Sequence, residues 1–180
     1  MIDLTPAQLQ VCDMQGQLFE QSRELCLASS AVFVRRFMNS RVAARFDEGS
    51  ALFEANTVES FMGELEMQYG PSSYGKVKYN PEALYWMGYL YRYWCSVYNW
   101  SSKRVYKVIQ ARELNALYYP YHSLEPARAI ERICDAKGIA LPAVSGAPDA
   151  IEDVGRVAEG VELLRKIKKR HATDYFAIRL

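Results

Sequence analysis

The chain has 180 residues, of which 50% are hydrophobic and 24% are charged, a composition that is typical of a globular domain and excludes disordered and collagen-like chains. Its 22 lysines and arginines nearly balance its 21 aspartates and glutamates, so no overall field attracts nucleic acid or an anionic membrane. This length fits one domain, or two small ones that share a core, and is sufficient to fold without disulfides or metals.

The sequence predicts a cytoplasmic protein without membrane contact. No stretch is long and apolar enough to span a bilayer, and the N-terminal MIDLTPAQLQ lacks the basic and apolar regions of a signal peptide. The cysteines lack the close pairing of zinc or redox motifs. We therefore expect buried free thiols at Cys12, Cys26, Cys95 and Cys134.

The first predicted element is a long helix. Thr5 followed by Pro6 is a typical start, because Thr caps free N–H groups and Pro has none to leave unpaired. Apolar residues then continue a helical stripe to residue 28, although Gly16 weakens the pattern in its middle.

Two further helices and a loop follow. Ser29 and Ser30 open a second helix, which we expect to run to a turn over residues 47–50. Asn56 or Thr57 caps the next helix. The segment YGPSSYGKVKYN is rich in Gly, Pro and Ser and predicts a loop.

Residues 80–121 are the most informative stretch, since they hold all three tryptophans and most of the tyrosines. Asn80 and Pro81 predict a helix start. The side of this helix opposite its apolar stripe is aromatic where an ordinary surface helix is charged. Surplus tyrosine and tryptophan are characteristic of recognition surfaces, and a densely aromatic core is the alternative. The residues that we predict to bind a partner are Tyr85, Tyr89, Arg92, Tyr93, Tyr121 and His122.

The remainder of the chain also predicts helices. Ser101 opens a short helix, Pro120 is expected to end the helical period, and a last helix of this half begins near Pro126 and stops at Gly138. Beyond it, the sequence predicts a linker, an amphipathic helix with a basic end, and a short extended tail, TDYFAIRL.

The two halves resemble each other when they are superposed with an offset of about 72 residues. Chance similarity between amphipathic segments is the alternative explanation. The predicted fold class is all-α: a compact bundle of two similar three-helix units, followed by a C-terminal helix with an extended tail. We expect domains at 1–70, 71–138 and 139–180. Matched positions include Ser29 with Ser101, Phe33 with Val105, Phe37 with Ile109, and Val42 with Leu114.

Motifs that carry catalytic chemistry are missing from the sequence. It has no phosphate-binding glycine loop, no HExxH pair and no nucleophile elbow. Its only histidines are His122 and His171. Two histidines provide few side chains for a metal site or for an acid–base pair. We expect no enzyme activity, no cofactor and no metal; an enzyme on a helical scaffold is kept as an alternative.

A second alternative function is DNA binding. Residues 101–119 have the outline of a helix-turn-helix in which basic side chains face a phosphate backbone. The simpler interpretation is that these residues occupy the solvent side of an amphipathic helix. The residues concerned are Lys103, Arg104, Lys107 and Arg112.

The segments YGKVKYNPEALYWMGYLYRYW and SSKRVYKVIQARELNALYYPYHSLEPARAIERI resemble a family of small, mostly uncharacterised bacterial proteins, some of them associated with antitoxin genes. The similarity covers roughly residues 70–138, and more loosely 20–65. The positions that match the family outline are Ser101, Ser102, Val105, Ile109, Tyr121 and His122.

This resemblance implies a non-catalytic antitoxin that neutralises a cognate protein toxin, for which an ADP-ribosyltransferase-like enzyme is one candidate. The expected partners are that toxin, with a homodimer left open, and promoter DNA through autoregulation. No membrane partner is expected.

Overall fold

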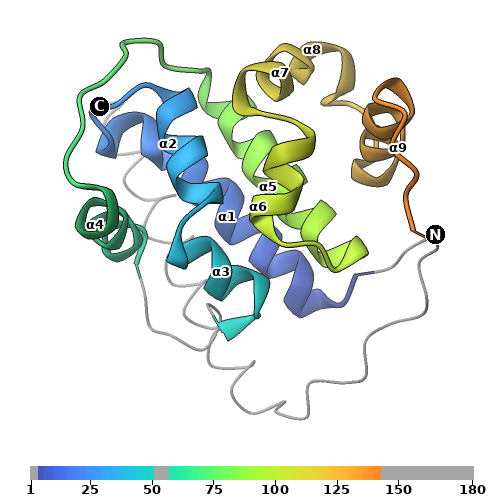
Figure 1. Cartoon of the computed structure of the whole chain (residues 1–180), viewed down its shortest axis with the longest axis horizontal. Helices are drawn as coiled ribbons and strands as arrows, with labels where there is room; N and C mark the ends of the chain where they lie inside the picture. Colours follow the sequence, from blue (N-terminus) through green and yellow to red (C-terminus); the bar gives the residue numbers. More distant parts are fainter. Residues whose placement is uncertain (1–3, 51–56, 143–180) are drawn as a thin grey trace, which may run out of the picture.

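The computed structural model describes residues 4–50 and 57–142. Across these residues the chain is helical and contains no strand (Figure 1), which confirms the all-α class. The predicted linker beyond 142, the amphipathic helix from Ala150 and the extended tail lie outside the described residues. The helices are α1 (Pro6–Leu25), α2 (Ser30–Met38), α3 (Arg41–Asp47), α4 (Val58–Tyr69), α5 (Pro81–Tyr98), α6 (Ser102–Val108), α7 (Ala111–Ala116), α8 (Tyr118–Tyr121) and α9 (Pro126–Ala136).

The long helices α1 and α5 lie side by side through the middle of the molecule, and the shorter helices surround them (Figure 1). Their contact is the most extensive between any two helices of the described chain. Glycine makes this close approach possible. A Cβ on Gly88 would lie 2.5 Å from the carbonyl oxygen of Gln15, and one on Gly16 would lie 2.9 Å from the ring of Tyr85. Gly16, which weakened the sequence pattern, is thus a packing residue.

Local capping explains why the long helices begin where they do. The Thr5 side chain accepts the N–H of Gln8, whose own side chain accepts the N–H of Thr5, so the two residues form a capping box. The Asn80 side chain accepts the N–H of Glu82, and Pro81 is the first residue of α5. Both predicted starts are confirmed.

The predicted second helix is divided in the structure. Ser40 interrupts it because its hydroxyl accepts the N–H of Ala43 and so caps a separate helix, α3. The prediction that Pro120 ends the helical period was wrong as well. Proline is tolerated in the first turn of a helix, and Pro120 lies within the short α8, which continues to Tyr121.

The predicted loop over residues 69–80 is confirmed from residue 70, since α4 ends at Tyr69, and it is held against the start of α2. The N–H of Ser29 donates to the carbonyl of Tyr74, and the N–H of Ser30 to that of Val77. Gly75 has a positive φ of 77°, and a Cβ there would lie 2.7 Å from the Ser29 hydroxyl. The Ser-Ser pair therefore anchors the loop as well as opening the helix.

One hydrophobic core includes residues from both predicted units, from Val11 in α1 to Cys134 in α9. Three of the four cysteines are buried as expected, and Cys26 is half-buried. Burial raises the pKa of the Cys12 thiol to about 12. Among the described helices, none is long and apolar enough to cross a membrane.

Candidate functional site

A row of three tyrosine rings runs along one side of α5. Tyr85, Tyr89 and Tyr93 follow at four-residue spacing, which places them above one another on a helix. The ring centroids of Tyr85 and Tyr89 are 6.3 Å apart with planes at 29°, and those of Tyr89 and Tyr93 are 6.4 Å apart at 21°. The rings of Tyr85 and Tyr89 form the first wall of a groove.

The second wall joins α5 to α8. Trp86 meets the ring of Tyr118 edge to face, with centroids 5.8 Å apart. The ring of Tyr118 lies in turn 4.8 Å from the imidazole of His122. Since Trp86 follows Tyr85 directly, its side chain leaves the helix at a different angle and can hold α8 beside the row of tyrosines.

Between these walls lies a groove with a volume of about 490 Å³. We call it the aromatic groove. Its lining combines four aromatic rings with two carboxylates and one imidazole. The lining residues are Glu20, Glu82, Tyr85, Trp86, Tyr89, Tyr118 and His122.

Hydrogen bonds fix two of these side chains. The Tyr85 hydroxyl donates to Asp13 Oδ1 at 2.5 Å. Burial and this hydrogen bond raise the pKa of Tyr85 well above its usual range. His122 Nδ1 lies 3.1 Å from the carbonyl oxygen of Tyr118 and 3.0 Å from that of Tyr119. Because a carbonyl only accepts, Nδ1 carries the proton in this arrangement, and Nε2 is the remaining polar atom of the ring.

The structure brings three of the six predicted partner-binding residues to the aromatic groove: Tyr85, Tyr89 and His122. Tyr93 is buried at 9% exposure and is the last ring of the row, next to Tyr89. Tyr121 is half-buried and packs against the core. Neither of these two lines the groove.

Sequence reasoning missed both carboxylates and Tyr118. Glu82 could have been found, since it lies three residues before Tyr85 and four before Trp86 on one helix. Glu20 could not, because only the packing of α1 against α5 brings it to the groove. Tyr118 depends in the same way on the position of α8.

Arg92 lies elsewhere than we expected. We predicted that it binds a partner, but Arg92 is only 1% exposed and lies inside the molecule. Its Nε donates to Gln15 Oε1 at 2.8 Å, its NH1 to Asp47 Oδ1 at 2.7 Å and its NH2 to the Ser102 hydroxyl at 2.7 Å. Its guanidinium also lies 5.5 Å from the ring centroid of Phe46. Arg92 therefore joins α1, α3, α5 and α6 from inside.

Asp47, whose side chain is 19% exposed, completes this network at its outer end. It accepts the backbone N–H of Ser102 at 2.9 Å as well as the Ser102 hydroxyl at 2.7 Å. A carboxylate at this position accepts a free N–H at the start of α6. Its negative charge also interacts favourably with the positive end of the helix dipole. Arg92 and its partners thus use all their polar groups for the fold.

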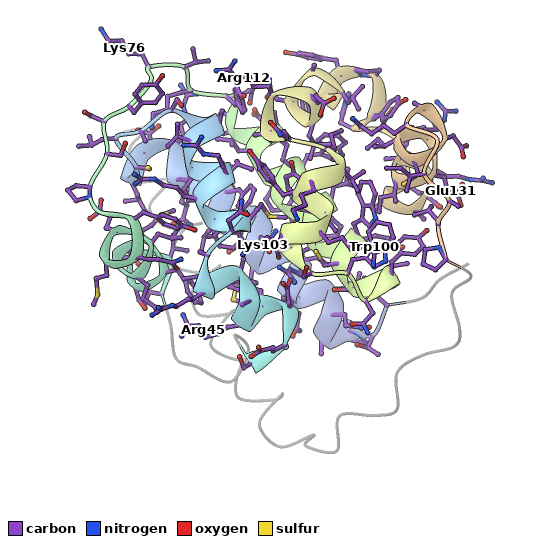
Figure 2. All side chains as sticks on the ribbon, in the orientation of Figure 1. Arg45, Lys76, Trp100, Lys103, Arg112 and Glu131 are labelled. Carbon is purple, nitrogen blue, oxygen red and sulfur yellow. The ribbon has the colours of Figure 1, made fainter. Side chains whose placement is uncertain are left out.

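The four basic residues of the DNA-binding alternative are all exposed. Figure 2 shows Lys103 and Arg112 at separate places, Lys103 at the start of α6 and Arg112 at the edge of the molecule near α7. The Arg104 guanidinium lies 3.8 Å from the ring centroid of Trp100. All four residues are therefore exposed, but they do not form one compact cluster around a groove.

No group of three or more His, Cys, Asp or Glu side chains is placed to hold a metal within residues 4–50 and 57–142. The chain matches no protein-family model, no curated protein and no solved structure.

Proposed function

We propose that this protein is a non-catalytic interaction protein that binds and neutralises a protein toxin, with the aromatic groove as a principal contact. One observation carries the proposal: Tyr85, Trp86, Tyr89 and Tyr118 line an open groove with their rings instead of being fully enclosed in the core. Tyrosine and tryptophan dominate the binding energy of protein interfaces because they bury a large area at a low cost in side-chain entropy.

The toxin is inferred from the family resemblance of residues 70–138. An inhibitor needs no catalytic residues to neutralise an enzyme, because a complementary surface that covers the enzyme's cleft is sufficient. An ADP-ribosyltransferase-like enzyme is the proposed target class. We propose that this activity takes place in the cytoplasm.

We also propose that the fold derives from two related helical units. Gly16 and Gly88 are 72 positions apart in the sequence, and both lie at the crossing of α1 and α5. Ser29 and Ser101 share this offset, and each is the N-cap residue of a short helix. Matching packing residues at one offset support duplication better than matching hydrophobicity does, because a glycine at a helix crossing is a specific requirement.

The test is co-expression with the product of the neighbouring gene. We expect that product to arrest growth when expressed alone, and this chain to restore growth and co-purify as a stoichiometric complex. Light scattering during gel filtration would distinguish a heteromeric complex from a homodimer. A neighbour that is harmless alone, together with a chain that elutes without it, would contradict the proposal.

DNA binding is the second candidate, supported by the exposure of Lys103, Arg104 and Lys107 on α6. It predicts binding to the chain's own promoter that weakens as salt rises, because phosphate contacts release counterions. Lys103→Glu should then weaken binding to every sequence alike. If promoter affinity is the same for Lys103→Glu and the original chain, α6 does not contact DNA.

A further inference from the structure

Two carboxylates line the aromatic groove in a protein whose overall charge is nearly balanced. Glu20 comes from α1, and Glu82 comes from the first turn of α5. The residues that line the groove in the described chain include no lysine or arginine. Aromatic faces beside carboxylates are the combination that attracts a cation, because ring quadrupoles and carboxylates act in the same direction.

We propose that the groove binds an arginine or lysine side chain of the protein partner. The cation would lie against the rings of Tyr85 and Tyr89, beside Trp86, and pair with Glu82. This inference rests on the partner-binding function proposed above and names the chemistry of the side chain that the partner presents.

The described structure already uses this chemistry. Arg36, Arg45, Arg92 and Arg104 each place their guanidinium near an aromatic ring, at distances to the ring centroid of 5.5, 5.8, 5.5 and 3.8 Å. Arg45 also pairs with Glu64 at 2.6 Å. This side chain therefore combines a ring and a carboxylate in the way that we propose for the ligand.

Arginine suits the groove better than lysine. Tyr85 and Tyr89 present nearly parallel rings, and a planar guanidinium stacks on such a surface while it donates two hydrogen bonds to one carboxylate. The hydrogen bond from Tyr85 to Asp13 holds the first ring in place before any ligand arrives. A groove that is ordered in advance loses less entropy on binding.

The first experiment is an NMR titration of the full chain with N-acetyl-arginine amide. The chain has three tryptophans, and only Trp86 lines the groove. We expect a saturable shift of the Trp86 indole N–H signal, with the signals of Trp94 and Trp100 unchanged. The neutral analogue N-acetyl-citrulline amide has nearly the same shape and should shift the Trp86 signal far less. Equal shifts for both compounds, or none for either, would overturn the proposal.

Matched variants test which residues hold the cation. Glu82→Gln and Tyr89→Leu should each weaken arginine binding by about fivefold or more, because one removes a carboxylate and the other a ring. Glu24→Gln makes the same charge change on α1, where the Glu24 side chain is 83% exposed outside the groove. It should leave the affinity unchanged. An unaltered affinity in Glu82→Gln would overturn the assignment.

Binding to the neighbouring gene product separates this inference from the proposed function. A complex that weakens about fivefold or more with Glu82→Gln supports both. A complex that Glu82→Gln does not affect overturns the cation site and leaves the function standing. No complex at all overturns both, whatever the arginine titration shows.

The chain's own basic segment is the competing occupant. Replacing Lys166, Lys168, Lys169 and Arg170 together by Gln should leave the Trp86 signal of the full chain where it is. If that replacement moves the signal before any arginine is added, the segment itself fills the groove and the proposal is overturned.

Discussion

Arg92 shows how a charge that looks exposed in the sequence becomes a buried structural group. Its hydrogen-bond partners Gln15 and Asp47 lie 77 and 45 residues away along the chain, so no local pattern could reveal them. Helical spacing did place Tyr85 and Tyr89 on one side of α5, because that spacing is local. What the sequence lacked was the register between α1 and α5, which decides which residues of each helix meet.

The buried network should be costly to break. Asp47→Asn removes the charge that faces Arg92, whose side chain is 2% exposed, and should lower the free energy of unfolding by about 3 kcal/mol, because an uncompensated buried charge remains. Glu131→Gln breaks the exposed pair with Arg128, whose side chains are 45% and 72% exposed, and should cost less than about 1 kcal/mol. Urea unfolding of both variants measures these changes in the free energy of unfolding. Equal costs would contradict the structural role of Arg92.

Tyr85 predicts a specific dependence on pH. Its pKa is raised in the folded state above the ordinary value of 10.0, so above that pH the unfolded chain loses this proton first and stability falls. At pH 8, Tyr85→Phe should be less stable than the original chain by about 1 kcal/mol, because it lacks the hydrogen bond to Asp13. At pH 11 the difference should shrink or reverse. A difference that stays constant in urea titrations at the two pH values would argue against this hydrogen bond.

Among the helices, the starts were predictable where a cap lies next to its helix in the sequence, as with Thr5 and Asn80. The break at Ser40 was missed because a serine on a continuous apolar stripe can belong to the helix or cap the next one. Packing decides between the two, since Val42 and Phe46 of α3 enter the same core as Phe37 of α2.

Two glycine substitutions should have opposite effects on stability, one at the crossing of α1 and α5 and one on the open side of α4. Gly88→Ala should lower the free energy of unfolding by about 2 kcal/mol, because its Cβ would meet the backbone of Gln15 at 2.5 Å. Gly63→Ala in α4 should raise it by up to about 1 kcal/mol, because nothing lies within 4 Å of the new Cβ and alanine favours helix. Thermal or urea unfolding compares them. A neutral Gly88→Ala would mean that the helices are farther apart than described.

In the whole molecule, the two halves share one hydrophobic core, and residues 70 and 71 lie in the loop that connects α4 to α5. Composition and helical period were sufficient for the all-α class. They could not show how α1 and α5 would pair, because contacts between residues so far apart in the chain leave no local pattern.

Thiol labelling tests that shared core. Cys12, Cys95 and Cys134 are buried, whereas Cys26 is half-buried, and burial raises the pKa of Cys95 to about 11. At pH 8 we expect Cys26 to react first and the other three to react only as the whole molecule unfolds, because the thiolate is the reactive form. Mass spectrometry of labelled peptides identifies the sites. Early labelling of Cys134 with Cys12 still protected would show that the second half opens independently.

If the aromatic groove binds the protein partner, hydroxyl-radical footprinting of the chain with and without the neighbouring gene product should detect the contact. We predict that oxidation of Trp86, Tyr89 and Tyr118 falls strongly in the complex. Tyr74, which is 77% exposed on the loop before α5, should be oxidised equally in both samples. A complex in which the groove residues stay as reactive as in the free chain would contradict the account.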